Sequence, residues 1–219
     1  MENISKEQYH TLSIKGEFYR KTIHIFSSSI PIGYYFLSKD TVLTILLPLL
    51  FCMIVVEFFK YKSETVYNLY LKYFKFLLRE HEFNRDKFRI NGASWVLLAD
   101  IVCLILFPKY IAISGMLLLS LSDSASAIIG RLYGKKKFAP NRSYAGTLAF
   151  LITGILIVIF SPKYVYYPME YYLGLIAVFV TTLADSVKLP VDDNFAIPVV
   201  FSGLLYLLYI IFLPSILLF

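Results

Sequence analysis

The chain has 219 residues, of which 58% are hydrophobic and only 16% are charged, and its mean hydropathy is +0.67. Soluble domains average about 25% charged residues, so this composition excludes an ordinary soluble protein and predicts an integral membrane protein. The formal net charge is +6. Among partners we expect the lipid bilayer and no nucleic acid. Cys52 and Cys103 both fall in apolar segments, which predicts neither a disulfide nor a cysteine metal site.

Seven apolar segments predict an all-α bundle of about seven transmembrane helices. The first residues are charged and lack the apolar region of a signal peptide, so we expect the first span to be retained. Several segments are near or below the roughly 17–25 residues that cross a hydrocarbon core, and the last can bend at Pro198 or Pro214. No long linker or repeat is present, so we expect residues 1–219 to form a single integral membrane catalytic domain. The segments lie near 22–38, 41–59, 92–107, 109–130, 145–161, 171–188 and 195–217.

The basic residues predict how the bundle is oriented. If the spans alternate, every basic residue falls on the side of the N-terminus except Lys39, Lys109 and Lys163. The positive-inside rule then places the N-terminus in the cytoplasm and the C-terminus outside. The polar clusters described next all fall at the cytoplasmic ends of their spans, where nucleotides are found.

The first polar cluster precedes the first span. Glu17, Arg20, Lys21 and His24 are spaced i, i+3, i+4 and i+7, so a helix presents all four on one face. One interpretation is flanking positive charge with snorkelling Arg and Lys side chains. The other is a functional face directed into the bundle.

A second feature is an amphipathic helix near residues 61–80. Its apolar side chains, such as Leu69 and Tyr73, recur at helical spacing, and Lys72, Lys75 and Arg79 lie on the opposite face. Such a helix is expected in the cytoplasmic interface. It can serve as a surface anchor or can admit a lipid substrate from the leaflet, and both interpretations remain open.

The fourth span contains a carboxylate, Asp123, within an otherwise apolar helix. A charged side chain at the centre of a membrane helix costs about 3 kcal/mol or more, so such a residue is rarely without a function. Ser122, Ser126 and Gly130 repeat every four residues, which is typical of closely packed helices. That packing interpretation accounts for the small residues but not for Asp123.

A glycine-rich basic loop follows this span. Backbone N–H groups and cations of this kind are suited to phosphates. The next helix is expected to begin near Ser143, and its dipole would add to the positive field. A lysine run alone would be an ordinary topology signal. The candidate phosphate-binding residues are Gly130, Arg131, Gly134, Lys135, Lys136, Arg142, Ser143 and Gly146.

A second acidic cluster, Asp192-Asp193-Asn194, lies between the last two spans. Together with Asp123, these carboxylates are hard-oxygen ligands of the kind that Mg²⁺ takes alongside phosphate oxygens. The alternative is a polar turn in which Asp193 or Asn194 caps the last helix. Glu57 lies near the cytoplasmic end of the second span, and Asp100 in the third span receives no role.

These motifs together resemble a family of CTP-dependent membrane enzymes. Asp123 with Gly130-Arg131-x-x-Gly134-Lys135, then Arg142-Ser143-x-x-Gly146, is similar to the motif shared by dolichol, polyprenol and phytol kinases, CTP-dependent diacylglycerol kinases and phosphatidate cytidylyltransferases. Three further motifs resemble the kinase branch. They are Glu17-x-x-Arg20-Lys21-x-x-His24, then Glu82 with Asn91-Gly92-Ala93, and Asp192-Asp193-Asn194 followed by Pro198.

The chain departs from the family pattern at three positions. Ser122 stands where a Gly usually precedes the membrane aspartate, and Arg142 stands where the family usually has Lys. Asp185 stands near the place of a common Glu. The glycine-rich cytidylyltransferase signature is absent, which favours a kinase.

The resemblance implies transfer of the γ-phosphoryl group of CTP to the hydroxyl of an isoprenoid alcohol or diacylglycerol at the cytoplasmic face. Asp123, Asp192 and Asp193 would hold Mg²⁺, while Lys135, Lys136 and Arg142 would cradle the phosphates. Arg20 and Lys21 would stabilise the transition state, and Asp123 or Glu57 would accept the hydroxyl proton. CTP as the donor rests on the resemblance alone. A cytidylyltransferase and a non-enzymatic transporter are the alternatives, and a homo-oligomer is left open.

Overall fold

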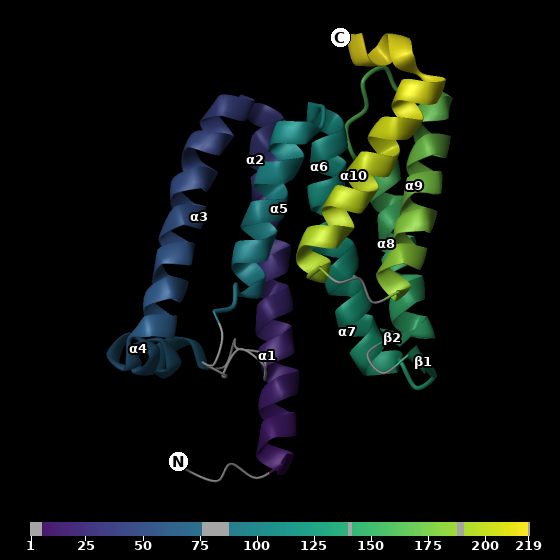
Figure 1. Cartoon of the computed structure of the whole chain (residues 1–219). Helices are drawn as coiled ribbons and strands as arrows, with labels where there is room; N and C mark the ends of the chain where they lie inside the picture. The colour runs from purple at the N-terminus through teal and green to yellow at the C-terminus, as the bar shows by residue number, and fades with distance from the viewer. Residues whose placement is uncertain (1–5, 76–87, 140–141, 188–190, 219) are drawn as a thin grey trace.

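The computed structural model describes residues 6–75, 88–139, 142–187 and 191–218, and nearly all of them are helical (Figure 1). In chain order the helices are α1 (Lys6–Ser27), α2 (Ser29–Phe36), α3 (Lys39–Lys62), α4 (Glu64–Phe74), α5 (Gly92–Leu106), α6 (Lys109–Leu117), the π-helical segment η3 (Leu118–Asp123), α7 (Ser124–Tyr133), α8 (Tyr144–Phe160), α9 (Pro168–Ser186), α10 (Asp193–Phe212) and the 3₁₀ turn η4 (Pro214–Leu218). The predicted helical class is therefore confirmed.

The seven predicted apolar segments each coincide with helical structure. Within the described ranges, three helices are long and apolar enough to cross a membrane, namely Lys39–Lys62, the continuous α6–η3–α7 helix Lys109–Tyr133, and Asp193–Phe212. Gly92–Leu106 and Tyr144–Phe160 are shorter apolar helices. The count of seven crossings and the orientation in the membrane remain predictions.

The first predicted span is broken into two helices. Ser27 Oγ donates to the His24 carbonyl at 2.7 Å, and Ser28 Oγ donates to the Ile25 carbonyl at 2.6 Å. Serine side chains that bond to the backbone in this way compete with the helical ladder. At the other end of the chain α10 continues through Pro198 but stops before Pro214, because proline lacks the N–H that the next turn would need.

The predicted interfacial helix is present as α4, with different bounds. Residues 61–62 belong to α3, because Ser63 interrupts the helix and its Oγ accepts the Val66 N–H at 3.5 Å. Residues 76–80 lie outside the described ranges. None of the side chains of α4 is buried, and the helix lies across the foot of α3 (Figure 1).

A short antiparallel ribbon between α7 and α8 was not predicted. Strands β1 (Lys137–Ala139) and β2 (Arg142–Ser143) pair Lys137 with Ser143 and Ala139 with Arg142 (Figure 1). The basic loop is thus folded back on itself, and Arg142 lies in β2 directly before the start of α8.

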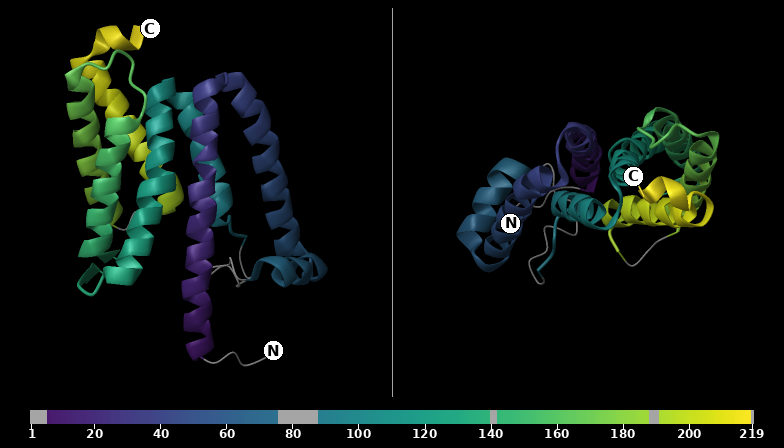
Figure 2. Two further views of the ribbon diagram at one scale, coloured as in Figure 1. Left: turned by 180° about the vertical axis from the view of Figure 1, so that it is seen from behind. Right: turned by 90° about the horizontal axis from the view of Figure 1, so that it is seen from above.

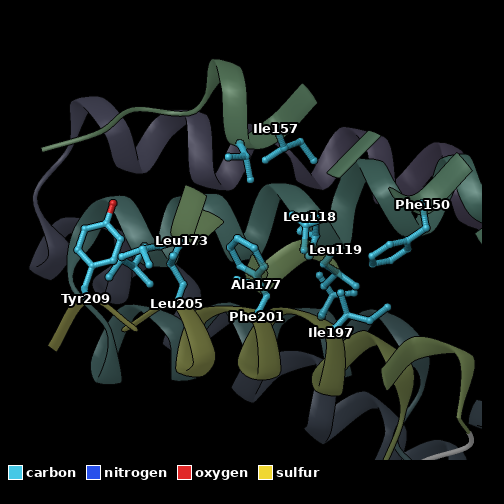
Figure 3. Close-up of a cluster of buried hydrophobic side chains, with 14 of the residues drawn as sticks. Leu118, Leu119, Phe150, Ile157, Leu173, Ala177, Ile197, Phe201, Leu205 and Tyr209 are labelled. Atoms are coloured by element: carbon cyan, nitrogen blue, oxygen red, sulfur yellow. The ribbon is translucent and has the colours of Figure 1, made fainter. Parts of the chain in front are cut away.

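Two apolar clusters hold the bundle together. The larger one joins η3, α8, α9 and α10 through side chains such as Leu118, Phe150, Ala177 and Phe201 (Figure 3). The second joins α2, α3, α5 and α6. In the view from above, α3 and α4 lie on one side of the molecule and α8, α9 and α10 on the other, with α1 between them (Figure 2).

The predicted site elements meet toward one end of the bundle. The start of α1, α4, the end of α7, the β1–β2 ribbon and the end of α9 all lie toward the lower end in Figure 1, whereas η4 lies at the opposite end.

Candidate active site

Asp123 forms a buried ion pair with the N-terminal helix. It is the last residue of η3, and its carboxylate accepts a hydrogen bond from Lys21 Nζ of α1. His24 Nδ1 lies 3.9 Å from the same carboxylate oxygen. The side chains of Lys21 and Asp123 are only 7% and 11% exposed, so each charge compensates the other where water cannot. A π-helical turn is rare and is frequent at functional sites.

Glu17 links α1 to α7 one helical turn further out. Its Oε2 accepts from Arg20, and from Arg131 Nη2 at 3.3 Å. Burial alone would raise the pKa of Glu17, but the Arg20 hydrogen bond and the charges of Arg20, Lys21 and Arg131 outweigh it and lower the pKa. The predicted stripe on α1 therefore faces the helix that carries Asp123, and Glu17, Lys21 and His24 pair with Arg131 or Asp123 of that helix.

Arg142 forms a clasp between three segments, which we call the Arg142 clasp. From β2 its Nη1 donates to Asp185 Oδ2 of α9 at 2.7 Å, and its Nη2 donates to Asp193 Oδ2 of α10 at 2.9 Å. Asp185 is buried, whereas the Asp193 side chain is 51% exposed. A small open crevice lies beside the clasp and includes Asp185, Asp193 and Thr181 in its lining.

Asp192 and Asn194 organise the start of α10. Asp192 Oδ1 accepts the Asn194 N–H at 3.0 Å and caps the helix. The expected cap is therefore present, but the residues named for it, Asp193 or Asn194, were wrong. Asn194 is 1% exposed, and its Nδ2 donates to the Gly92 carbonyl at 3.2 Å. This contact joins the Asp-Asp-Asn motif to the Asn-Gly-Ala motif at the start of α5.

The Asp123 pair and the Arg142 clasp lie within electrostatic reach of each other. The positive charge of Arg142 acts on Asp123 together with Lys21 and His24. The negative charges of Asp123 and Asp193 act on Asp185. Within the described ranges, however, no three His, Cys, Asp or Glu side chains gather as a ready metal site. The predicted magnesium ligands Asp123, Asp192 and Asp193 are instead engaged by Lys21, the Asn194 N–H and Arg142.

The glycines of the basic loop allow two helices to approach closely. A Cβ on Gly130 would lie 3.4 Å from Gly146 Cα, and a Cβ on Gly146 would lie 2.9 Å from the Ser126 carbonyl. Ser143 caps α8, its Oγ accepting the Gly146 N–H at 3.2 Å, so the predicted helix start is confirmed. These contacts support the packing interpretation of the small residues. Lys135 and Lys136 are exposed beside this junction.

Glu57 is a brace between α3 and α5. Its Oε1 accepts the Asn91 N–H at 3.0 Å and the Ser94 hydroxyl at 2.8 Å, and the residue is 1% exposed. Asn91 in turn caps α5 through the Ser94 N–H at 2.9 Å. These hydrogen bonds connect α3 to the start of α5. Glu82, which carries another part of the kinase resemblance, lies outside the described ranges.

Three fungal enzymes named CTP-dependent diacylglycerol kinase 1 are similar to this chain. The Eremothecium gossypii and Schizosaccharomyces pombe enzymes are each 32% identical over 60% of this chain and over 47% and 65% of their own lengths. The Saccharomyces cerevisiae enzyme is 29% identical over 90% of this chain and 75% of its own length. These matches support the CTP-dependent lipid kinase family. No family model matches the chain, and no solved structure matches it.

The chain spans about half and about two thirds of the first two kinase relatives, and three quarters of the third. Two residues that the kinase resemblance includes, but that received no chemical role, also make contacts at this site. His24 joins Lys21 beside Asp123, and Asp185 holds Arg142. An acidic residue near the end of an apolar segment was the available signal for Asp185. The brace partner Ser94 has no signal in the sequence, because its role depends on a residue of another helix.

Proposed function

We propose that the chain transfers the γ-phosphoryl group of CTP to the hydroxyl of a membrane lipid alcohol at the cytoplasmic face. One set of contacts carries the proposal: Asp123 of the fourth predicted span pairs with Lys21 of α1, and Arg142 of β2 pairs with Asp185 of α9 and Asp193 of α10. The charge of Arg142 also acts on Asp123. The similarity to three CTP-dependent diacylglycerol kinases supports CTP as the donor and a lipid as the acceptor.

Phosphoryl transfer needs positioning and charge neutralisation more than covalent chemistry. Lys21 of α1 contacts Asp123, while Arg20 of α1 and Arg131 of α7 share Glu17. Lys135, Lys136 and Arg142 follow α7 in the chain. In this proposal Arg142, Lys135 and Lys136 bind the phosphates, with the backbone at Gly130, Gly134, Ser143 and Gly146 beside them. Arg20 and Lys21 stabilise the charge that develops on the transferred group.

The donor set at this corner suits a magnesium ion brought in with the triphosphate. Mg²⁺ takes one or two carboxylates together with phosphate oxygens, so it does not need a preformed cage of three acids. Asp185 Oδ1 is buried and has no hydrogen-bond partner among the described residues. In this proposal Asp193, Asp192 and Asp123 would hold the ion, which would neutralise charge on the phosphates.

Asp123 is the better candidate to accept the hydroxyl proton. Glu57 Oε1 accepts the Asn91 N–H and the Ser94 hydroxyl, whereas Asp123 lies beside Lys21 and His24, two groups that can carry a proton. A lipid hydroxyl that reaches Asp123 from the bilayer would approach beside α1, whose other faces are exposed at Phe18, Ile23 and Phe26.

The proposal is tested with purified protein in liposomes that contain one lipid alcohol each: diacylglycerol, phytol or a longer polyprenol. We expect label from γ-labelled CTP, but not from α-labelled CTP, to enter the lipid of at least one preparation, and a weaker signal with ATP. Label from α-labelled CTP in the lipid would identify a cytidylyltransferase instead. No turnover of CTP with any of the alcohols would contradict the kinase proposal and favour a transporter or a lipid-binding protein.

A further inference from the structure

The two contacts of Arg142 differ in how they can be broken. Its ion pair with Asp185 lies between side chains that are 21% and 4% exposed. Its ion pair with Asp193 reaches a carboxylate that is 51% exposed, at the first residue of α10. A buried pair is screened little, and separating it strands a charge away from water. An exposed pair is weak and can be replaced by water or by another anion.

A triphosphate oxygen is a stronger partner for a guanidinium than a solvated carboxylate. Phosphate carries more charge and matches the planar fork of Arg geometrically. Arg142 also lies directly before Ser143, which caps α8, so a phosphate bound there would lie near the positive end of that helix. An incoming nucleotide would therefore displace Asp193 first and leave Asp185 in place.

We propose that Asp185 is a positioning residue that keeps Arg142 fixed, and that Asp193 occupies the place of a nucleotide phosphate until CTP binds. The inference rests on the proposed function and assigns a binding order to its site. When a phosphate oxygen takes Arg142 Nη2, Asp193 is released and becomes available to the divalent cation that accompanies the triphosphate.

The exchange couples the nucleotide to the divalent cation. Asp185 already experiences the negative charges of Asp123 and Asp193, with Arg142 as the opposing charge. If a phosphate oxygen replaces Asp193 at Arg142 Nη2, the released Asp193 carboxylate adds negative charge to the carboxylates of Asp123 and Asp185 and to the triphosphate. A divalent cation offsets that repulsion, so each ligand binds more tightly when the other is present.

Equilibrium binding of radiolabelled CTP to the full-length protein in detergent tests this without any turnover. The protein is compared in EDTA and in excess Mg²⁺. Asp193→Asn removes the competing carboxylate, so we expect it to bind CTP in EDTA about threefold tighter than wild type and to gain less from Mg²⁺. Asp192→Asn removes the neighbouring charge while keeping a good helix cap, and its effect in EDTA should be smaller.

Asp185→Asn should weaken CTP binding in both buffers, and Asp185→Glu should restore part of it, because only the glutamate returns a carboxylate to Arg142. Asp40→Asn, at the exposed first turn of α3, serves as the matched control and should bind like wild type. Size-exclusion profiles confirm that each variant is folded. The half-exposed Asp193 variant keeps the test usable if Asp185→Asn does not fold.

An Asp193→Asn protein that binds CTP in EDTA no more tightly than wild type would overturn the exchange. An equal gain in Asp192→Asn would overturn it as well, because general repulsion would then explain both. These outcomes leave the kinase proposal intact as long as wild type binds CTP with Mg²⁺. If wild type does not bind CTP under any condition, the proposed function itself fails.

Discussion

The buried pair between Lys21 and Asp123 gives the sharpest prediction about stability. Both side chains are nearly inaccessible to solvent, at 7% and 11% exposure, and they come from helices far apart in the sequence. Removing one partner leaves an uncompensated charge, which costs about 3–5 kcal/mol for a buried pair. Lys21→Met and Asp123→Asn should therefore each destabilise the protein strongly.

The double variant should recover most of that loss. With both charges removed no stranded ion remains, and replacing a buried pair by neutral groups is often close to neutral in stability. A protein of this size changes its melting temperature by about 2–4 °C per kcal/mol. Each single variant should thus melt about 6–20 °C below wild type, while the double variant should melt within a few degrees of it.

Thermal unfolding in one detergent, followed by intrinsic fluorescence of Trp95 and the tyrosines, measures all four proteins. The sum of the two single losses should exceed the loss in the double variant by at least about 2 kcal/mol. Lipid phosphorylation should remain absent in the double variant, because charge balance restores the fold and not the chemistry. A Lys21→Met protein as stable as wild type, or strictly additive losses, would refute a compensated buried pair.

Three further predictions concern other parts of the bundle. Glu57→Gln keeps one acceptor oxygen for Asn91 and Ser94, so its activity in a lipid kinase assay should lie within about tenfold of wild type. Glu57→Ala loses both hydrogen bonds and should lower the free energy of unfolding by about 1–3 kcal/mol. A folded but inactive Glu57→Gln would make Glu57 the base. Gly146→Ala should destabilise the protein by about 1–3 kcal/mol, because its Cβ meets the backbone at Ser126 and Gly130. Gly33→Ala, whose Cβ meets nothing within 4 Å, should be neutral or stabilising. Equal melting temperatures of these two variants would contradict the packing account. Burial lowers the pKa of Lys163 to about 8, with Glu170 opposing the shift. Between about pH 8 and 10 the unfolded chain therefore binds more protons than the folded one, and wild type should gain stability relative to Lys163→Met as the pH rises through that window. A constant difference between these two proteins would count against the buried amine.

The sequence predicted most of the helices because their signals are local. Apolar runs and the helix start near Ser143 depend on neighbours within a few residues. The interruption at Ser63 and the stop before Pro214 are just as local but were not predicted, since the first was read as helix and the second as a bend. The four-residue stripe on α1 also follows from helical spacing. The break at Ser28 and the β1–β2 ribbon were missed, because neither interrupts the pattern of apolar and polar residues.

The contacts between helices were harder to predict. Lys21 and Asp123 were both expected in the site, but their direct pairing depends on how α1 packs against η3. Glu57 was expected as a candidate base, which stays a prediction, and its contact with Ser94 of α5 could not be seen in the sequence. Arg142 and Asp185 were noted separately as departures from the family pattern, and the structure places them in one ion pair. Arg142 is longer than the usual Lys and Asp185 is shorter than the usual Glu, so the two departures compensate each other across one contact.

The central claim is that Asp123 takes part in phosphoryl transfer at the corner that it shares with the Arg142 clasp. The most direct measurement is the initial rate of lipid phosphorylation from γ-labelled CTP by Asp123→Asn, at a temperature where the variant is folded, beside wild type and Asp40→Asn. We expect Asp123→Asn to lose at least about a thousandfold and Asp40→Asn to match wild type. A folded Asp123→Asn protein with a rate near that of wild type would contradict the claim.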